Sequence, residues 1–183
     1  MFEIVDISKY FNNIGITELS KRNLGEFTVG SGSLPYIENY INKVFFIDNS
    51  IPFFIQKSNF ENGYMDNFTL NEQVIHIDYT FLKNIHLLAA ANNGDYTIDL
   101  KIETFHSMKS LKIEIFDAVE DEEYKKNKKR LFLGAMNTAN INTPLNFLNT
   151  CLWYYKISVN DNAKSIKFPF NSDVHIFAIT IER

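Results

Sequence analysis

The sequence predicts an all-β protein whose strands form a sandwich or a barrel. Three features of its 183 residues support this prediction. Apolar and polar residues alternate through several segments, short runs between turn residues are apolar on both faces, and helical patterns are weak. The length suits one domain, and the sequence contains no internal repeat and no linker. We therefore expect a single domain spanning residues 1–183.

Three segments have the pattern of strands that bury only one face. In DYTIDLKIET, residues 95–104, apolar side chains at every second position share one face: Tyr96, Ile98, Leu100 and Ile102. The segments SLKIEIF (110–116) and KSIKFPF (164–170) repeat this alternation. Because antiparallel sheets commonly have one face on the core and one in water, these segments predict antiparallel strands.

Four other segments are apolar at consecutive positions, so we expect both of their faces to be buried. They are VFFI (44–47), PFFI (52–55), IHLLAAA (85–91) and the closing SDVHIFAITIER (172–183). In the last of these, one alternating set is Val174, Ile176 and Ala178, and the other is Phe177, Ile179 and Ile181. A strand of this kind must lie deep in a sheet that other parts of the chain cover.

The connections are also visible in the sequence. Asn93-Gly94 predicts a hairpin turn, because both residues tolerate the positive φ that a tight turn requires, and Asn62-Gly63 predicts a second turn. The charge-dense segment 117–130 predicts an exposed loop or a short helical turn. The polar segment 136–149 predicts a long connection.

Composition and charge exclude several classes of protein. A net charge of −4 argues against a general nucleic-acid binder, and no apolar run reaches the ~20 residues of a membrane helix. The first residues lack the basic and apolar regions of a signal peptide, so we expect a cytoplasmic protein, with an extracellular one left open. The single cysteine, Cys151, lies in an apolar run and predicts a buried side chain.

Several short stretches together resemble the galactose-binding-like modules found beside the catalytic domains of glycoside hydrolases and other carbohydrate-active proteins. They are residues 7–17, SGSLP (31–35), residues 64–78, residues 85–100 and HIFAITI (175–181). The resemblance implies a jelly-roll β-sandwich of about eight strands in two packed antiparallel sheets. It also implies a carbohydrate as ligand, and a carbohydrate-active enzyme or a second copy of the chain as partner. Modules of this kind often hold a structural calcium ion near the chain ends, where Asp6 and Glu182 could contribute oxygen ligands.

The leading functional prediction is therefore a non-catalytic carbohydrate-binding protein. A sugar site needs an aromatic platform for the C–H faces and amides or carboxylates for the hydroxyls. Aromatic side chains adjoin such groups in several expected loops, and we select four candidate residues: Trp153, Tyr64, Asp66 and Asn67. We expect no catalytic residue and no resident cofactor in this reading.

Two alternatives remain at this point. One is a structural or protein-interaction sandwich that uses the charged segment 117–130 or an apolar patch and binds no small ligand. The other is a small sugar-modifying enzyme around His76 and Asp78, which lie two residues apart and therefore share one face of a strand. A cluster formed by His76, His86 and His175 is a further option for a metal or acid–base site.

Overall fold

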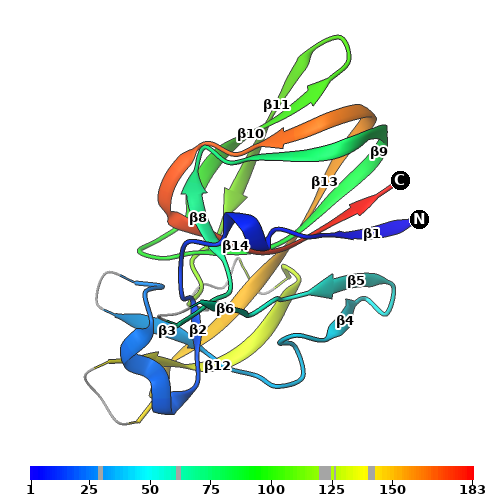
Figure 1. Cartoon of the computed structure of the whole chain (residues 1–183). Helices are drawn as coiled ribbons and strands as arrows, with labels where there is room; N and C mark the ends of the chain where they lie inside the picture. Colours follow the sequence, from blue (N-terminus) through cyan, green and yellow to red (C-terminus); the bar gives the residue numbers. More distant parts are fainter. Residues whose placement is uncertain (29–30, 61–62, 120–124, 126, 140–142) are drawn as a thin grey trace.

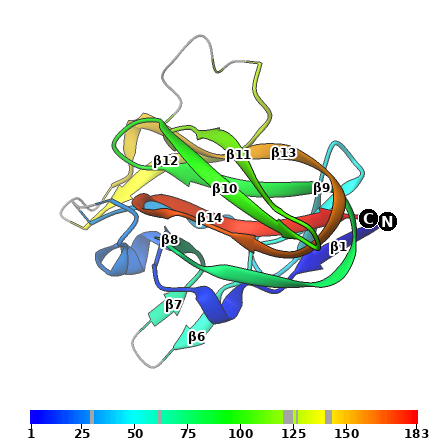
Figure 2. The ribbon, with the colours of Figure 1, turned by 90° about the horizontal axis from the view of Figure 1, so that it is seen from above.

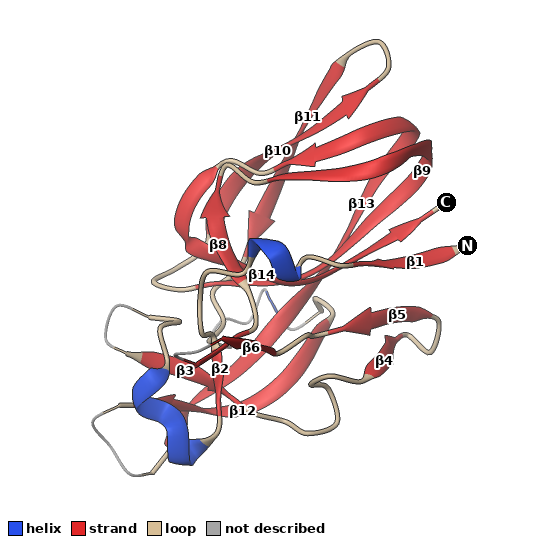
Figure 3. Cartoon of the chain, viewed as in Figure 1, coloured by secondary structure: helices blue, strands red, loops and turns tan. Residues whose placement is uncertain are grey.

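The computed structural model describes residues 1–183 except 29–30, 61–62, 120–124, 126 and 140–142. Strands dominate it, and the named helices of the described residues are two short 3-10 helices, η1 and η2 (Figure 3). In chain order the elements are β1 Phe2–Val5, η1 Ser8–Tyr10, β2 Ile16–Thr17, η2 Leu19–Leu24, β3 Gly32–Pro35, β4 Val44–Ile47, β5 Ile51–Phe54, β6 Ser58–Phe60, β7 Gly63–Met65, β8 Phe68–Asn71, β9 Val74–Ala91, β10 Tyr96–Thr104, β11 Met108–Ile115, β12 Arg130–Thr138, β13 Leu145–Lys167 and β14 Phe170–Glu182.

Ten of these strands are hydrogen-bonded into one sheet rather than into two separate antiparallel sheets. The main order is β1-β14-β9-β13-β12-β3-β2, with β8 added beside β14, β10 beside β13 and β11 beside β10. The sheet is mixed, because β2 and β3 run parallel whereas the other pairs are antiparallel. Two small hairpins, β4–β5 and β6–β7, complete the strands of the described residues.

The sheet curls because its two longest strands bend. Strand β9 has 18 residues and β13 has 23, and Figure 1 shows both of them arching over the upper part of the molecule. The register between them shifts between Ser158 and Asp161 and again between Ala163 and Ser165. Bulges of this kind bend a strand and increase its twist, so one continuous sheet can fold over its own core.

The central strands separate two hydrophobic clusters. Leu87, Ala89 and Ala91 of β9 belong to the first cluster, whereas Leu88 and Ala90 belong to the second. The first cluster is enclosed by the curled sheet, including β8, β10 and β11. The second cluster is covered by β2, β3 and the β4–β5 hairpin. Figure 2 shows the layer formed by β10 and β11 crossing over β14. The prediction that residues 85–91 are buried on both faces is confirmed.

The closing strand is also buried on both faces, but its alternation is interrupted. Ile176 and Ile179 lie in the first cluster, whereas the two residues between them, Phe177 and Ala178, both lie in the second. The register of β14 against β9 shifts between Ile176 and Ala178, which places two consecutive side chains on one face. The strict alternation predicted from the sequence is therefore wrong at this bulge.

The predicted hairpin at Asn93-Gly94 is wrong in its strand pairing. Both residues have positive φ, at 61° and 117°, but β9 and β10 do not pair with each other and each pairs with β13. The chain at Phe116–Ala118 occupies the position beside the end of β9 instead. Ala91 N donates to Phe116 O and Ala118 N donates to Ala91 O, both at 2.8 Å.

The prediction that both faces of the β4–β5 hairpin are buried is also wrong. Phe45 and Phe53 point into the second cluster, but Val44 and Phe46 are 54% and 60% exposed. The hairpin covers the second cluster with one face, and on its other face Val44 and Phe46 meet solvent. Residues 96–104 and 108–115 form antiparallel strands as predicted, here paired with each other, and Ile98, Leu100 and Ile102 are buried as the alternation indicates.

Three sequence predictions lie partly or wholly outside the described residues. They are the Asn62 half of the Asn62-Gly63 turn, residues 120–124 and 126 of the charged segment 117–130, and the centre of the connection 136–149. The ends of that connection are strand residues, because β12 extends to Thr138 and β13 begins at Leu145.

Two substitutions in β14 test the double-sided burial of this strand. Phe177 is fully buried, so Phe177→Ala should lower the free energy of unfolding by about 3–5 kcal/mol through lost contacts and a residual cavity. Phe170 lies in the same strand but is 67% exposed. Phe170→Ala should therefore change the free energy of unfolding by no more than about 0.5 kcal/mol. Chemical denaturation of both variants measures the difference, and equal losses would contradict the assignment.

Candidate functional site

Trp153 is a core residue, which removes the predicted aromatic platform. Its side chain is 0% exposed, its ring packs edge-on against Phe116, and its Nε1 donates to Asp117 O at 2.6 Å. The guanidinium of Arg130 lies 5.4 Å from its ring centroid. A sugar cannot reach a ring face that is enclosed in this way, so the expectation of stacking on Trp153 is corrected. The sequence could not reveal this, because both faces of β13 are apolar near Trp153.

Asp66 and Asn67 are also fully buried, and they form a polar cluster rather than a ligand-contacting pair. Asp66 accepts hydrogen bonds from Gly15 N at 3.0 Å, Ile16 N at 2.9 Å and Asn67 Nδ2 at 2.8 Å. Burial nevertheless raises the pKa of the Asp66 carboxyl to about 7, against the opposing effect of these donors. Asn67 also begins an N-glycosylation sequon, but in the folded chain it is inaccessible.

A chain of hydrogen bonds leads from this cluster to a surface hollow. Asn67 Oδ1 lies 2.9 Å from His175 Nδ1, and His175 Nε2 lies 3.0 Å from Asn92 Nδ2. Because Asn92 Nδ2 donates, His175 Nε2 accepts and its Nδ1 carries the proton toward Asn67. Burial lowers the pKa of His175 to about 3, so the imidazole remains neutral at physiological pH.

The hollow at the end of this chain has a volume of about 270 Å³ and lies at the end of β14 opposite the chain termini. We call it the loop hollow. It is lined by Asn13, Gly25, Glu26, Phe27, Thr28, Ser31, Thr69, Asn92, Ser172, Asp173 and His175. A neighbouring hollow of about 330 Å³ shares Phe27, Thr28 and Asn92 with it. Asp66 and Asn67 thus lie behind the lining, where they orient Asn13 and His175.

The loop hollow contains residues that the sequence did not single out. Asn13, Asn92 and Asp173 are separated by many positions, and no motif connects them. The sheet brings them together, since β9 ends and β14 begins on the same side. The turn predicted from Asn93-Gly94 was the available signal, because such turns position the neighbouring side chains.

Tyr64 precedes Asp66 by two residues but lines a different hollow. It is half-buried, and the ammonium groups of Lys21 and Lys57 each lie 5.0 Å from its ring centroid. The hollow that it lines has a volume of only about 10 Å³. The structure therefore brings Asp66 and Asn67 together, whereas Tyr64 nearby lines a separate small hollow and Trp153 lies in the core.

The histidines do not form a common site. His76 and Asp78 are both exposed on β9, whereas His86 and His175 are buried near opposite ends of the sheet. In the pairing of β9 with β14, His175 lies opposite Ala90, whereas His86 lies opposite Thr180 at the other end of the ladder. Among the described residues, neither His76 nor Asp78 lines the loop hollow, the hollow beside it, or the hollow at Tyr64.

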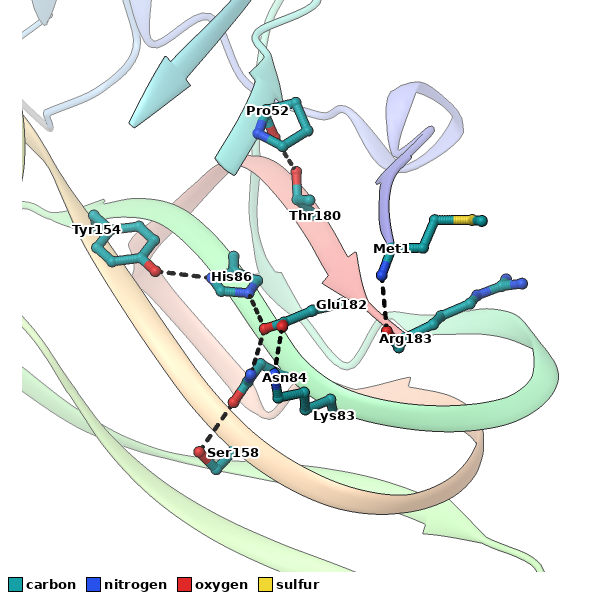
Figure 4. Close-up of polar contacts among 10 residues, drawn as sticks. All are labelled: Met1, Pro52, Lys83, Asn84, His86, Tyr154, Ser158, Thr180, Glu182 and Arg183. Atoms are coloured by element: carbon teal, nitrogen blue, oxygen red, sulfur yellow. Dashed lines mark hydrogen bonds and ion pairs between the residues drawn. The ribbon is translucent and has the colours of Figure 1, made fainter. Parts of the chain in front are cut away.

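His86 belongs to a second polar network, near the chain termini (Figure 4). Its Nδ1 lies 2.8 Å from the hydroxyl of Tyr154, and its Nε2 lies 3.4 Å from Glu182 Oε2 without good hydrogen-bond alignment. Lys83 Nζ donates to Glu182 Oε1 at 2.8 Å, and Asn84 Nδ2 donates to Oε2. The network connects β9, β13 and β14 across the open end of the second cluster.

The protonation states of this network suit a structural role. Hydrogen bonds from Lys83 and Asn84 hold the pKa of Glu182 at about 2, so it is ionised. Burial lowers the pKa of His86 and raises that of Tyr154 to about 12, so both rings are neutral at pH 7. A neutral phenol with this pKa is a poor general base. The network holds three strands together beside the paired termini, where Met1 N donates to Arg183 O.

The two carboxylates considered for calcium are separated. Asp6 follows Val5, which lies opposite Ile179, whereas Glu182 lies opposite Phe2. This register separates them by about four residues, or roughly 13 Å along the strands. Among the residues that the structure describes, no group of three or more His, Cys, Asp or Glu side chains could hold a metal ion.

Two simpler expectations concern Cys151 and the membrane. Cys151 is a free and fully buried thiol. Burial raises its pKa to about 12, as expected for a core residue rather than a nucleophile. No helix in the described ranges is long and apolar enough to cross a membrane.

The buried carboxyl of Asp66 gives a testable pH dependence. Its pKa is about 7 in the folded chain and about 3.9 in an unfolded one, so its contribution to stability is greatest below pH 4 and is lost as the pH rises to about 7. Asp66→Asn removes this titration. The stability advantage of the wild-type protein over Asp66→Asn should therefore shrink between pH 4 and pH 7, as measured by urea denaturation. Exposed Asp78→Asn is the control, and a constant difference for Asp66→Asn across this range would refute the assignment.

Comparison with known proteins supports the fold and leaves the ligand open. A family model described as an AziU2-like beta-sandwich domain matches residues 3–183, which is nearly the whole chain. No curated protein matches the chain. The description of the family names an architecture, and this architecture agrees with the curled sheet and its two clusters. The protein is therefore a β-sandwich protein that belongs to the AziU2-like beta-sandwich domain family.

Proposed function

We propose that this protein is a non-catalytic carbohydrate-binding module that holds a neutral sugar in the loop hollow. The observation that carries the proposal is the buried hydrogen-bond chain from Asp66 through Asn67 and His175 to Asn92. This chain fixes polar side chains at the base of the hollow. Fixed donors and acceptors favour a ligand rich in hydroxyl groups, since little ordering entropy is lost when it binds.

The rim of the loop hollow supplies the groups that would contact the sugar. Glu26 and Ser172 are exposed there, and Thr28, Thr69 and Asp173 are half-buried. Hydroxyls and carboxylates of this kind accept and donate hydrogen bonds to sugar hydroxyls. A volume of about 270 Å³ is slightly below the range of about 300–1,000 Å³ typical of drug-sized ligands, which suits one small saccharide unit.

Hydrogen bonds rather than stacking would dominate binding at this site. Phe27 lines the hollow, but it is only 1% exposed and packs against His175 with ring centroids 4.4 Å apart. We therefore expect weak affinity. The adjoining hollow of about 330 Å³ gives room for a second sugar unit on the other side of Phe27 and Asn92.

The resemblance to galactose-binding-like modules is a second support for the proposal. In this view the curled sheet is a modified jelly roll, and the loop hollow lies at a loop end of the sandwich. A carbohydrate-active enzyme is the partner that such a module would serve.

Titration of ¹⁵N-labelled protein with neutral monosaccharides and oligosaccharides tests the proposal. Trp153 is a poor reporter because it is buried in the first hydrophobic cluster and does not line the loop hollow. The side-chain amide signals of Asn13 and Asn92 should be followed instead. A binding sugar should shift these signals. Glu26→Gln and Asp173→Asn should each weaken binding about tenfold, because a hydrogen bond to a charged group contributes about 1.5–3 kcal/mol.

Glu38→Gln is the matched control, because Glu38 is exposed and does not line the loop hollow. This variant should bind as the wild-type protein does. The proposal is wrong if no neutral sugar shifts the Asn13 and Asn92 signals at millimolar concentration. It is also wrong if the Glu38 variant loses as much affinity as the two rim variants.

A further inference from the structure

A second hollow, of about 500 Å³, lies between β11 and the middle of β13, on a part of the sheet distinct from the loop hollow. We call it the edge groove. Its two sides are residues 111–114 of β11 and residues 153–158 of β13. No described strand pairs with the edges of these two strands that face this region, which distinguishes the edge groove from an ordinary depression between side chains.

The open edge of β13 follows from its pairing. Toward β12 its ladder ends where Trp153 lies opposite Arg130, and toward β10 a ladder begins only at Ala163. Tyr154 N still donates to Lys129 O at 2.9 Å. Because backbone groups alternate between the two edges of a strand, those of Lys156 and Ser158 point to the same side as those of Tyr154. No described strand pairs with them there.

Strand β11 has a free edge along its whole length. In the described part of the chain it pairs only with β10, through all eight of its residues. An unpaired row of N–H and C=O groups is a template for another strand. The edge groove therefore offers main-chain hydrogen bonds at β11 and at Lys156 and Ser158 of β13.

The rim of the edge groove is positively charged. Lys112, Lys128 and Lys156 are all exposed and line it, and among the lining residues that the structure describes the carboxylate is that of Glu114. None of these three lysines forms an ion pair with a described residue, whereas the nearby Lys109 is bound to Asp161 at 2.7 Å. In a chain with a net charge of −4, this local excess of positive charge favours an acidic partner.

The floor of the edge groove is apolar. Ile113, Phe116, Tyr155 and Ile157 line it and are buried or half-buried. An extended peptide presents alternate side chains to opposite faces. One set can therefore pack on this floor while the other set meets the lysines.

From these observations we propose that the edge groove binds an acidic, extended segment of another protein by strand addition. The segment hydrogen-bonds to the free edge of β11, places apolar side chains on the floor and pairs its carboxylates with Lys112, Lys128 and Lys156. This is a known physical mode of peptide recognition, in which backbone bonds supply affinity and alternate side chains supply specificity. It does not depend on sugar binding, which takes place at a different hollow.

The test uses fluorescently labelled octapeptides and the full chain. The probe alternates glutamate with valine, a charge control replaces each glutamate with lysine, and a backbone control carries N-methyl groups at alternate amides. The acidic probe should bind by fluorescence anisotropy, more weakly at high salt, and the two control peptides should not. In hydrogen exchange the acidic probe should protect amides of residues 108–115 and those of Lys156 and Ser158.

Charge reversal locates the site. The double variant Lys112→Glu/Lys156→Glu should weaken binding by about tenfold or more, because it turns two attractions into repulsions. Lys43→Glu, directly before β4 and outside the lining of the edge groove, should leave the peptide affinity unchanged.

Three results would overturn the proposal. If no acidic peptide binds, the lysines merely protect an open edge from aggregation. If the N-methylated peptide binds equally well, strand addition is wrong. If a sulfated polysaccharide binds with loss in the double variant but without amide protection, the edge groove recognises anionic polymers instead of peptides.

Discussion

Three adjacent strands, β9, β13 and β14, bury side chains on both faces, and the rest of the chain has to cover both. This constraint determines the architecture. The bulges in β9, β13 and β14 let the sheet curl over the first cluster. One sheet therefore covers both sides of this cluster, whereas a sandwich normally uses two separate sheets. The small strands β2 and β3 and the β4–β5 hairpin cover the second cluster. Many of the buried polar side chains that the structure describes join hydrogen-bonded networks, as around Asp66 and around His86.

The two candidate binding regions lie where this cover ends. At the loop end of β14, a polar chain from Asp66 reaches the surface through His175 and forms the base of the loop hollow. At the middle of β13, β12 has ended and β10 has not yet begun, so the edge groove opens between two unpaired edges. Opposite the loop end, the His86 network and the paired termini close the second cluster. The same strands thus produce one region suited to hydroxyl groups and another suited to an extended acidic chain.

The sequence predicted the class of fold and most of the buried strands, because period-2 alternation and doubly apolar runs report burial directly. It failed where tertiary contacts override local signals. Asn93-Gly94 has the turn conformation, yet Phe116–Ala118 displaces β10 from the side of β9. For the candidate site, Asp66 and Asn67 were selected for their polarity, but they support the lining from behind. Trp153 was selected for its ring, which the apolar surroundings bury. Residue type indicates what a side chain can do, whereas exposure depends on which strands pair across the sheet.

Native-state hydrogen exchange tests most directly whether the doubly covered strands form the stable centre of the molecule. The account predicts that amides in residues 85–91, 151–155 and 176–181 exchange slowest, and only through global unfolding. Amides of the β10–β11 hairpin, which is covered on one face and open at one edge, should exchange sooner. If the hairpin amides outlast those of β9 and β14, the central strands do not organise this fold, and the account is wrong.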